Sequence, residues 1–205
     1  MRDAARVFFR YGSPRLLAIG LAGLAIARLA VGGFGLGDLL AAGAVAAAWP
    51  WLEWTLHVTL LHLRPFTIAG RRIDPEFARR HRAHHREPWR FELIFLPLWV
   101  HALTAPLSIA LAFALAPSPA LALSALVALF AMALQYEWVH FLVHTRVWPR
   151  RKAFQRLWRN HRLHHFKSER HWFGFTVVAV DRLMGTAPDP RSVPTSPTCR
   201  TLGVD

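Results

Sequence analysis

Ten of the twelve histidines in this 205-residue sequence follow a pattern that occurs twice. Each copy has a histidine pair, then a basic stretch, then an H-x-x-H-H cluster. Both copies also begin with the dipeptide Glu-Trp. Two such copies are not expected by chance, so the pattern indicates one site built by two related halves. The histidines are His57, His62, His81, His84 and His85 in the first half, and His140, His144, His161, His164 and His165 in the second.

The chemistry that suits these residues is metal binding. Imidazole is the commonest metal ligand and binds in its neutral form, so a bound cation would keep the crowded, basic segments from repelling themselves. Ten nitrogens are too many for one ion, and two ions with four or five ligands each is the simplest count. The single cysteine, Cys199, excludes a multi-cysteine site. All-histidine ligation suits iron, zinc or copper, and the sequence does not separate iron from zinc.

The spacing of the histidines is meaningful if their segments are helical. At about 100° per residue, the three imidazoles of each H-x-x-H-H cluster share one face of a helix. His140 and His144 share a face in the same way. His57 and His62 are five positions apart, which places them roughly 140° apart on a regular helix. Either that helix contains a π-bulge or bend, or the two histidines reach toward different metals.

Two carboxylates are candidates for groups behind the ligands. Glu53 lies four positions before His57, and Glu137 lies three before His140. Because an ionisable residue inside a membrane span is a functional suspect, we expect both to accept imidazole N–H groups and fix ring orientation. The alternative is that they lie at the membrane interface and pair with arginine.

Other polar residues near the boxes each have two interpretations. Asn160 could cap a helix or support a ligand from behind. Asp181 could cap the last helix or orient a histidine. His101 and His171 stand outside the repeat and are expected to be ordinary structural histidines.

The elements that must position these residues are membrane helices. Hydrophobic residues make up 54% of the chain, yet the formal net charge is +13, so apolar and basic residues must be segregated. Four apolar stretches approach the roughly 20 residues that span a bilayer, and none resembles a signal peptide. Pro97 and Pro106 interrupt the third, which could be a kinked span or a re-entrant hairpin. The stretches are 16–36, 38–63, 93–115 and 119–144.

Charge placement predicts the orientation. All of the 25 basic residues except Arg28 lie in segments 1–15, 64–90 and 145–205. With four spans these segments face one side, which the positive-inside rule makes cytoplasmic. Arg28, near a span end, is expected to snorkel to the interface. Anionic headgroups account for the basic charge, so we expect no nucleic-acid partner.

The predicted fold is therefore an all-α integral membrane protein. Four transmembrane helices form two hairpins, and a helical cytoplasmic cap carries the histidine-rich dinuclear site. The Ala/Arg-rich composition suggests a bacterial cytoplasmic membrane. We expect a single domain, 1–205, made of a basic N-terminus (1–15), a first helix pair (16–63), a histidine-box segment (64–92), a second helix pair (93–144), a histidine-box cap (145–186) and a Pro-rich tail (187–205).

The histidine boxes resemble those of the fatty acid hydroxylase/sterol desaturase superfamily of membrane di-metal oxygenases. They read H-x4-H, H-x2-H-H, H-x3-H and H-x2-H-H, and the resemblance runs from about 49 to 188. The stretch "HRLHHFKSERHWFGFTVVAVDRLMGT" is similar to the fatty acid 2-hydroxylase version, with its Phe-Gly-x-Thr at 173–176, late Asp181 and Gly185-Thr186. Beta-carotene hydroxylases usually have H-x4-H as the third box, which favours the lipid branch.

The resemblance implies a site of two metal ions, iron for activity or zinc as isolated, bound by the ten histidines. It implies hydroxylation of an unactivated C–H of a lipid with O2, with a fatty acyl 2-hydroxylase as the best interpretation. The fused cytochrome b5 domain of that family is missing, so a separate donor is expected, cytochrome b5-like or a ferredoxin with its reductase. Open alternatives are a sterol or carotenoid hydroxylase or desaturase, an inert relative with a structural metal, and a metal- or haem-binding transport or storage protein.

Overall fold

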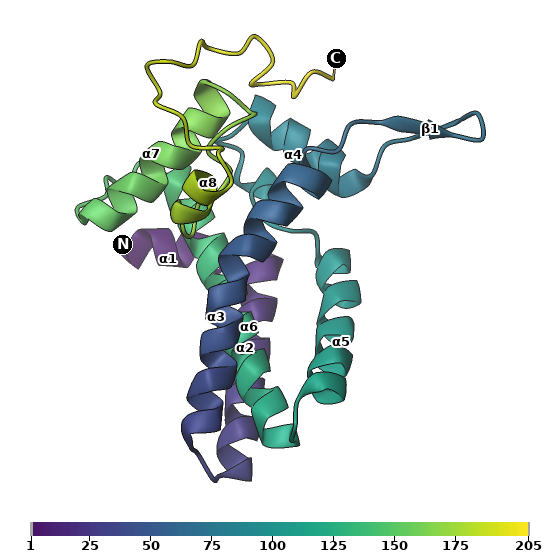
Figure 1. Cartoon of the computed structure of the whole chain (residues 1–205), viewed down its shortest axis with the longest axis vertical. Coiled ribbons are helices and arrows are strands. Elements are labelled where there is room, and N and C mark those ends of the chain that lie inside the picture. Colours follow the sequence, from purple (N-terminus) through teal and green to yellow (C-terminus); the bar gives the residue numbers. More distant parts are fainter. Residues whose placement is uncertain (1, 205) are drawn as a thin grey trace. The chain divides into compact units, whose positions relative to one another are not determined.

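The computed structural model describes residues 2–204 (Figure 1). These residues divide into two compact units. The first unit contains the residues up to Trp49 together with Phe95–Trp138. The second contains Pro50–Ile94 and the residues from Val139 onward. All ten repeat histidines belong to the second unit.

The first unit consists of apolar helices. They are α1 (Arg2–Phe8), α2 (Gly12–Val31), α5 (Leu98–Leu115) and the greater parts of α3 (Leu36–Leu56) and α6 (Pro119–Val143). Among the described residues, three stretches are long and apolar enough to cross a bilayer: Gly12–Val31, Phe91–Leu115 and Pro119–Val143. The chain is thus an integral membrane protein.

The prediction of four crossings is not confirmed, because the second predicted span, 38–63, is not among the stretches that are long and apolar enough to cross a bilayer. Helix α3 is rich in alanine and glycine, which are less apolar than leucine, and it carries Asp38 and Glu53. Its α-helical geometry ends at Leu56, where a π-helix, His57–Leu61, follows directly.

The third predicted span is one helix and not a re-entrant hairpin. Pro97 directly precedes α5, where its missing N–H costs no helical hydrogen bond. Pro106 lies inside the helix, which continues past it to Leu115.

The first unit contains a buried ion pair. Arg28 was expected to snorkel, but it is buried, and its guanidinium contacts the Asp38 carboxylate at 2.6 Å and the Ser124 hydroxyl at 2.8 Å. The ion pair joins the end of α2 to the start of α3, so the charge is neutralised where the chain turns.

The second unit contains a small sheet, which corrects the all-α prediction. Strands β1 (Phe66–Ile68) and β2 (Arg71–Ile73) pair antiparallel, with Phe66 opposite Ile73. Ala69 and Gly70 connect them and both have positive φ, as the two-residue turns favoured in hairpins require.

The remaining elements of the second unit are short helices. They are the π-helix η1 (His57–Leu61), α4 (Glu76–Arg86), the 3₁₀ turn η2 (Phe91–Leu93), α7 (Lys152–Phe166) and α8 (Ala179–Leu183). The Pro-rich tail packs against α4. There the Arg200 guanidinium donates to the His85 carbonyl at 2.8 Å, and Arg86 donates to the Val204 carbonyl.

Candidate metal centre

The structure brings all ten repeat histidines together in two groups of five. In each group, one ring nitrogen from every histidine lies within 4.8 Å of the others. Nine of the ten are buried, and His62 is half-buried. The first group contains His57, His62, His81, His85 and His164, and the second contains His84, His140, His144, His161 and His165.

Each H-x-x-H-H cluster is divided between the two groups. His81 and His85, one helical turn apart on α4, belong to the first group, whereas His84 belongs to the second. Helix α7 mirrors this arrangement, because only His164 joins the first group. Each half of the sequence therefore gives four histidines to its own group and one to the other. This exchange makes the two groups interdependent.

The pair His57 and His62 reaches one group because the backbone between them is a π-helix. In η1 the His62 N–H donates to the His57 carbonyl, five residues back. The wider turn brings the two rings side by side, with centroids 5.1 Å apart. Of the two interpretations open from the sequence, the structure shows the π-bulge. Single π-turns inside helices occur frequently at functional sites.

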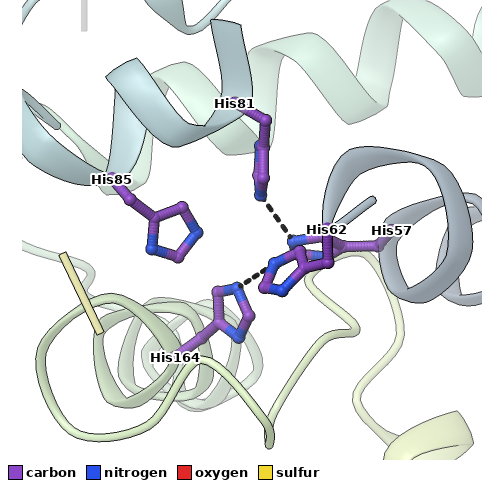
Figure 2. Close-up of side chains that lie close together, drawn as sticks. All are labelled: His57, His62, His81, His85 and His164. Carbon is purple, nitrogen blue, oxygen red and sulfur yellow. Dashed lines mark hydrogen bonds between the residues drawn. The ribbon is translucent and has the colours of Figure 1, made fainter. Parts of the chain in front are cut away.

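Within each group the ring nitrogens face one another. In the first group, Nε2 of His57 lies 3.2 Å from Nε2 of His81, and the Nε2 atoms of His62 and His164 are also 3.2 Å apart (Figure 2). The second group contains two such Nε2 pairs, His84 with His140 at 3.1 Å and His144 with His161 at 2.9 Å.

The two groups adjoin through one histidine of each. The rings of His85 and His165 stack with centroids 4.1 Å apart. No hydrogen-bond partner within residues 2–204 meets Nε2 of His85 or either nitrogen of His165, although these atoms are buried. Buried polar atoms of this kind normally have a partner, and a cation in each group would satisfy Nε2 of His85 and one nitrogen of His165.

Backbone carbonyls set the ring orientation in the first group. Nδ1 of His57 donates to the Phe173 carbonyl at 2.8 Å, and Nδ1 of His164 donates to the His171 carbonyl at the same distance. Nδ1 of His85 donates to the Cys199 carbonyl at 2.9 Å. Each bond fixes the proton on Nδ1 and leaves the Nε2 lone pair free for a cation, the usual arrangement behind a metal-bound histidine.

The histidines outside the apolar helices are held neutral. Burial is the largest cause that lowers the pKa of each imidazole, because it disfavours the charged form, and repulsion from neighbouring imidazoles lowers it further. For His85 the pKa falls to about 3. Neutral rings have the lone pairs that a metal needs. The other histidines whose pKa is lowered in this way are His81, His84, His144, His161, His164 and His165.

Glu53 supports the site through the backbone and not through an imidazole, which corrects its predicted contact. Its buried carboxylate accepts the N–H groups of Phe175 at 2.7 Å and Thr176 at 3.1 Å, together with the Thr176 hydroxyl. The Glu53 carboxylate thus holds residues 173–176, whose first member carries the carbonyl that orients His57.

Asp181 holds the same stretch at its other end. Its fully buried carboxylate accepts the N–H groups of Phe173 and Gly174, each at 2.8 Å, and the Thr186 hydroxyl at 2.7 Å. Within residues 2–204 this carboxylate makes no hydrogen bond to an imidazole, and the N-terminus of α8 has no side-chain cap. Desolvation raises its pKa against these hydrogen bonds. Asp181 therefore orients His57 indirectly, through the Phe173 backbone.

The other two predicted supporting residues differ. Asn160 lies well inside α7 and is no cap; its Nδ2 donates to the Gly174 carbonyl and, at 2.9 Å, to Asp181. Glu137 belongs to the first unit, where it accepts from the Ser13 hydroxyl at 2.5 Å and the Leu96 N–H at 3.4 Å. Its predicted support of a histidine of the metal centre stays a prediction.

Sequence reasoning missed the backbone acceptors. The carbonyls of Phe173, His171 and Cys199 act through main-chain atoms, which any residue type supplies. The one sequence feature that points to this region is the Phe-Gly-x-Thr stretch at 173–176. The structure explains its glycine, because a Cβ at Gly174 would lie 3.0 Å from the Val177 carbonyl oxygen and 3.1 Å from the Asp181 carboxylate.

Two cavities reach the histidines. One of about 700 Å³ is lined by His144, and one of about 370 Å³ by His62. Each group therefore has one histidine that borders a space large enough for part of a small molecule.

Comparisons with known proteins agree with this geometry. The fatty acid hydroxylase family model matches residues 42–186, a stretch that includes all ten histidines. The chain is 28% identical over 141 residues to dihydroceramide fatty acyl 2-hydroxylase FAH2 of Arabidopsis thaliana, a match that covers 68% of this chain and 57% of that protein. Among solved structures it is similar to full-length scs7p, in which only the hydroxylase domain is visible. There the TM-score is 0.72 at 24% identity, over 90% of this chain and 68% of the other.

Proposed function

The chain belongs to the fatty acid hydroxylase family of oxidoreductases, and from this premise we propose that it hydroxylates an unactivated C–H bond of a lipid acyl chain. The reaction takes O2, two electrons and two protons, places one oxygen atom in the new C–OH group and releases the other as water. The observation that carries the proposal is the pair of five-histidine groups. The chain spans 57% of the length of the curated relative that it matches.

The ten histidines would hold two metal ions, one in each group. The donor set is all nitrogen, which suits iron, zinc or copper better than magnesium or calcium. We propose iron as the ion for activity, because zinc has no redox chemistry, although zinc could occupy the site in isolated protein. The bound ions supply the activation of O2 and the transfer of electrons to it.

The protein's own residues orient the ligands and keep them neutral. The Phe173, Cys199 and His171 carbonyls hold Nδ1 protons away from the ions, and Glu53 and Asp181 hold the loop that carries the Phe173 carbonyl. Acid–base groups are not needed to oxidise a methylene. The burial of the ligands limits water near the oxidising centre.

We further propose that the basic segments and the histidine boxes face the cytoplasm of a bacterium, on the basis of the positive-inside rule. A separate soluble donor, cytochrome b5-like or a ferredoxin with its reductase, would supply the electrons. Hydroxylation at position 2 of the acyl chain is the preferred outcome, in view of the named activity of the Arabidopsis relative.

The proposal is tested by expression in a lipid-producing host followed by lipid mass spectrometry. Wild type should add one oxygen atom to acyl lipids, and His164→Ala should abolish the new species because it removes a ligand from the first group. Arg159→Ala is the control on the same helix: Arg159 is exposed and lies in neither group, so the product should persist. Identical lipid profiles for wild type and His164→Ala would refute the proposed activity.

A further inference from the structure

The larger cavity at the metal centre has charged residues in its lining, which the hydrocarbon part of an acyl chain does not explain. His144, one of the second group, lines it, together with the indole rings of Trp89, Trp148 and Trp158. Its volume of about 700 Å³ falls within the roughly 300–1,000 Å³ that small-molecule sites usually have. Two arginines, Arg146 and Arg162, also line it, and no carboxylate does.

Of the two arginines, Arg162 is the better candidate for binding a ligand, because it is half-buried and has no partner anion within residues 2–204. Its guanidinium carbon lies 4.7 Å from the ring centroid of Trp158, 5.1 Å from that of Phe166 and 5.6 Å from that of Trp89. Within residues 2–204 no hydrogen bond or ion pair reaches this guanidinium, although it has five N–H donors. These aromatic rings fix the position of the guanidinium and shield part of it from water.

A guanidinium in this state is suited to bind an anion. Its planar fork matches a carboxylate or a phosphate with two parallel hydrogen bonds, and such charge-assisted bonds are among the strongest in proteins. The aromatic walls beside it suit a hydrocarbon chain. The cavity therefore offers one fixed positive group and an apolar lining within a single space.

We propose that this cavity binds the anionic head of an amphiphilic acyl substrate, with Arg162 as the residue that anchors it. The head is a carboxylate, as in a free fatty acid, or a phosphate, as in a phospholipid. The inference rests on the proposed function, since it names the class of lipid that the same site takes. Dihydroceramide, named for the Arabidopsis relative, carries no charge and would leave Arg162 without its partner.

The geometry also bears on which carbon reacts. Arg162 and His144 border the same cavity, so an anchored head lies near the second histidine group. If the head is a carboxylate, the carbons closest to it are then the ones presented to the metal centre, which agrees with oxidation at position 2 of the acyl chain.

The test is lipid binding to the purified, metal-loaded full chain in detergent. Radiolabelled palmitate, its uncharged methyl ester and phosphatidic acid are the probes, and the variants are Arg162→Gln, Arg162→Lys and Arg159→Gln. Arg159 lies on the same helix, is exposed and does not line the cavity, so it controls for the loss of one charge. Arg162→Gln should weaken palmitate or phosphatidic acid about tenfold or more and leave the methyl ester unchanged. Arg162→Lys should recover part of the affinity.

The outcomes separate this inference from the proposed function. The anionic probe whose binding depends on Arg162 identifies the carboxylate or the phosphate as the head. The inference would be overturned if wild type bound neither palmitate nor phosphatidic acid more tightly than the methyl ester, or if Arg162→Gln and Arg159→Gln lost affinity equally. Either result would count even if the enzyme hydroxylates lipids in the host. Binding needs no turnover, so Arg162-dependent binding without any hydroxylation would overturn the activity and leave the anion site standing.

Discussion

At the scale of single residues, the site depends on where each imidazole keeps its proton. Where a backbone carbonyl accepts from Nδ1, as Cys199 does from His85, the Nε2 lone pair is available to a cation. The Nε2 atoms of His144 and His161 approach to 2.9 Å, a distance at which one ring must donate in the absence of metal. A cation removes that constraint, because both rings can then direct lone pairs at it.

Asp181 provides a test of whether the residues that hold the Phe173 backbone also keep His57 in position. Asp181→Asn replaces one acceptor oxygen with an NH2 group that faces the backbone N–H of Phe173 or Gly174. We expect a loss of about 2 kcal/mol or more in the free energy of unfolding, because a buried donor is left without its acceptor. We also expect a lower metal-to-protein ratio, since the Phe173 carbonyl no longer holds His57 firmly.

The matched control is Asp189→Asn, at an exposed aspartate whose carboxylate accepts hydrogen bonds from Arg191. Thermal denaturation and elemental analysis of both variants give the two readouts. Equal metal content in Asp181→Asn and wild type would show that the carboxylate stabilises the fold without supporting the ligands.

At the same scale, the sequence predicted the ligand types but not the groups behind them. The ten histidines stood out because a metal site requires particular side chains at regular spacing. Glu53 and Asp181 were singled out as candidate supporting carboxylates, yet both accept main-chain N–H groups of residues 173–176, and main-chain groups have no signature in sequence.

At the scale of elements, local backbone geometry decides which histidines meet. The π-helix η1 places His57 and His62 in one group although they are five positions apart. The sequence alone left this open, because no residue type between them requires a π-helix. The exchange of His84 and His164 between groups was equally hidden. All three histidines of a cluster lie on one broad face of a helix. The placement of the neighbouring helices decides which of the three belongs to which group.

The close packing of α2 and α6 gives a prediction at this scale. A Cβ at Gly20 would lie 2.6 Å from the Phe130 ring, whereas a Cβ at Gly23 would meet nothing within 4 Å. We expect Gly20→Ala to destabilise the protein by about 1–3 kcal/mol, because a rigid ring must shift. Gly23→Ala on the same helix is the control and should be neutral or slightly stabilising. Melting temperatures in detergent distinguish the two, and equal shifts for both variants would contradict the packing.

The limits of sequence-based prediction also show in the elements. The hairpin of β1 and β2 was missed because Ala69, unlike glycine or asparagine, gives no turn signal despite its positive φ. The span predicted at 38–63 was too long, because it counted the alanine-rich helix α3 and the π-helix η1 as one continuous transmembrane helix.

At the scale of the whole molecule, the chain separates two tasks between two units. The first unit holds apolar helices suited to a bilayer. The second holds all ten histidines, the loop that orients His57 and the tail whose Cys199 carbonyl orients His85. This division explains how one chain combines 54% hydrophobic residues with a net charge of +13.

The most direct test of the central claim is the metal content of the wild-type protein, purified from iron-replete cells and measured by elemental analysis against protein concentration. Two groups of five histidines predict two metal ions per folded chain, with iron in the active preparation. A folded, monodisperse protein that carries no metal, or only one ion per chain, would contradict the account.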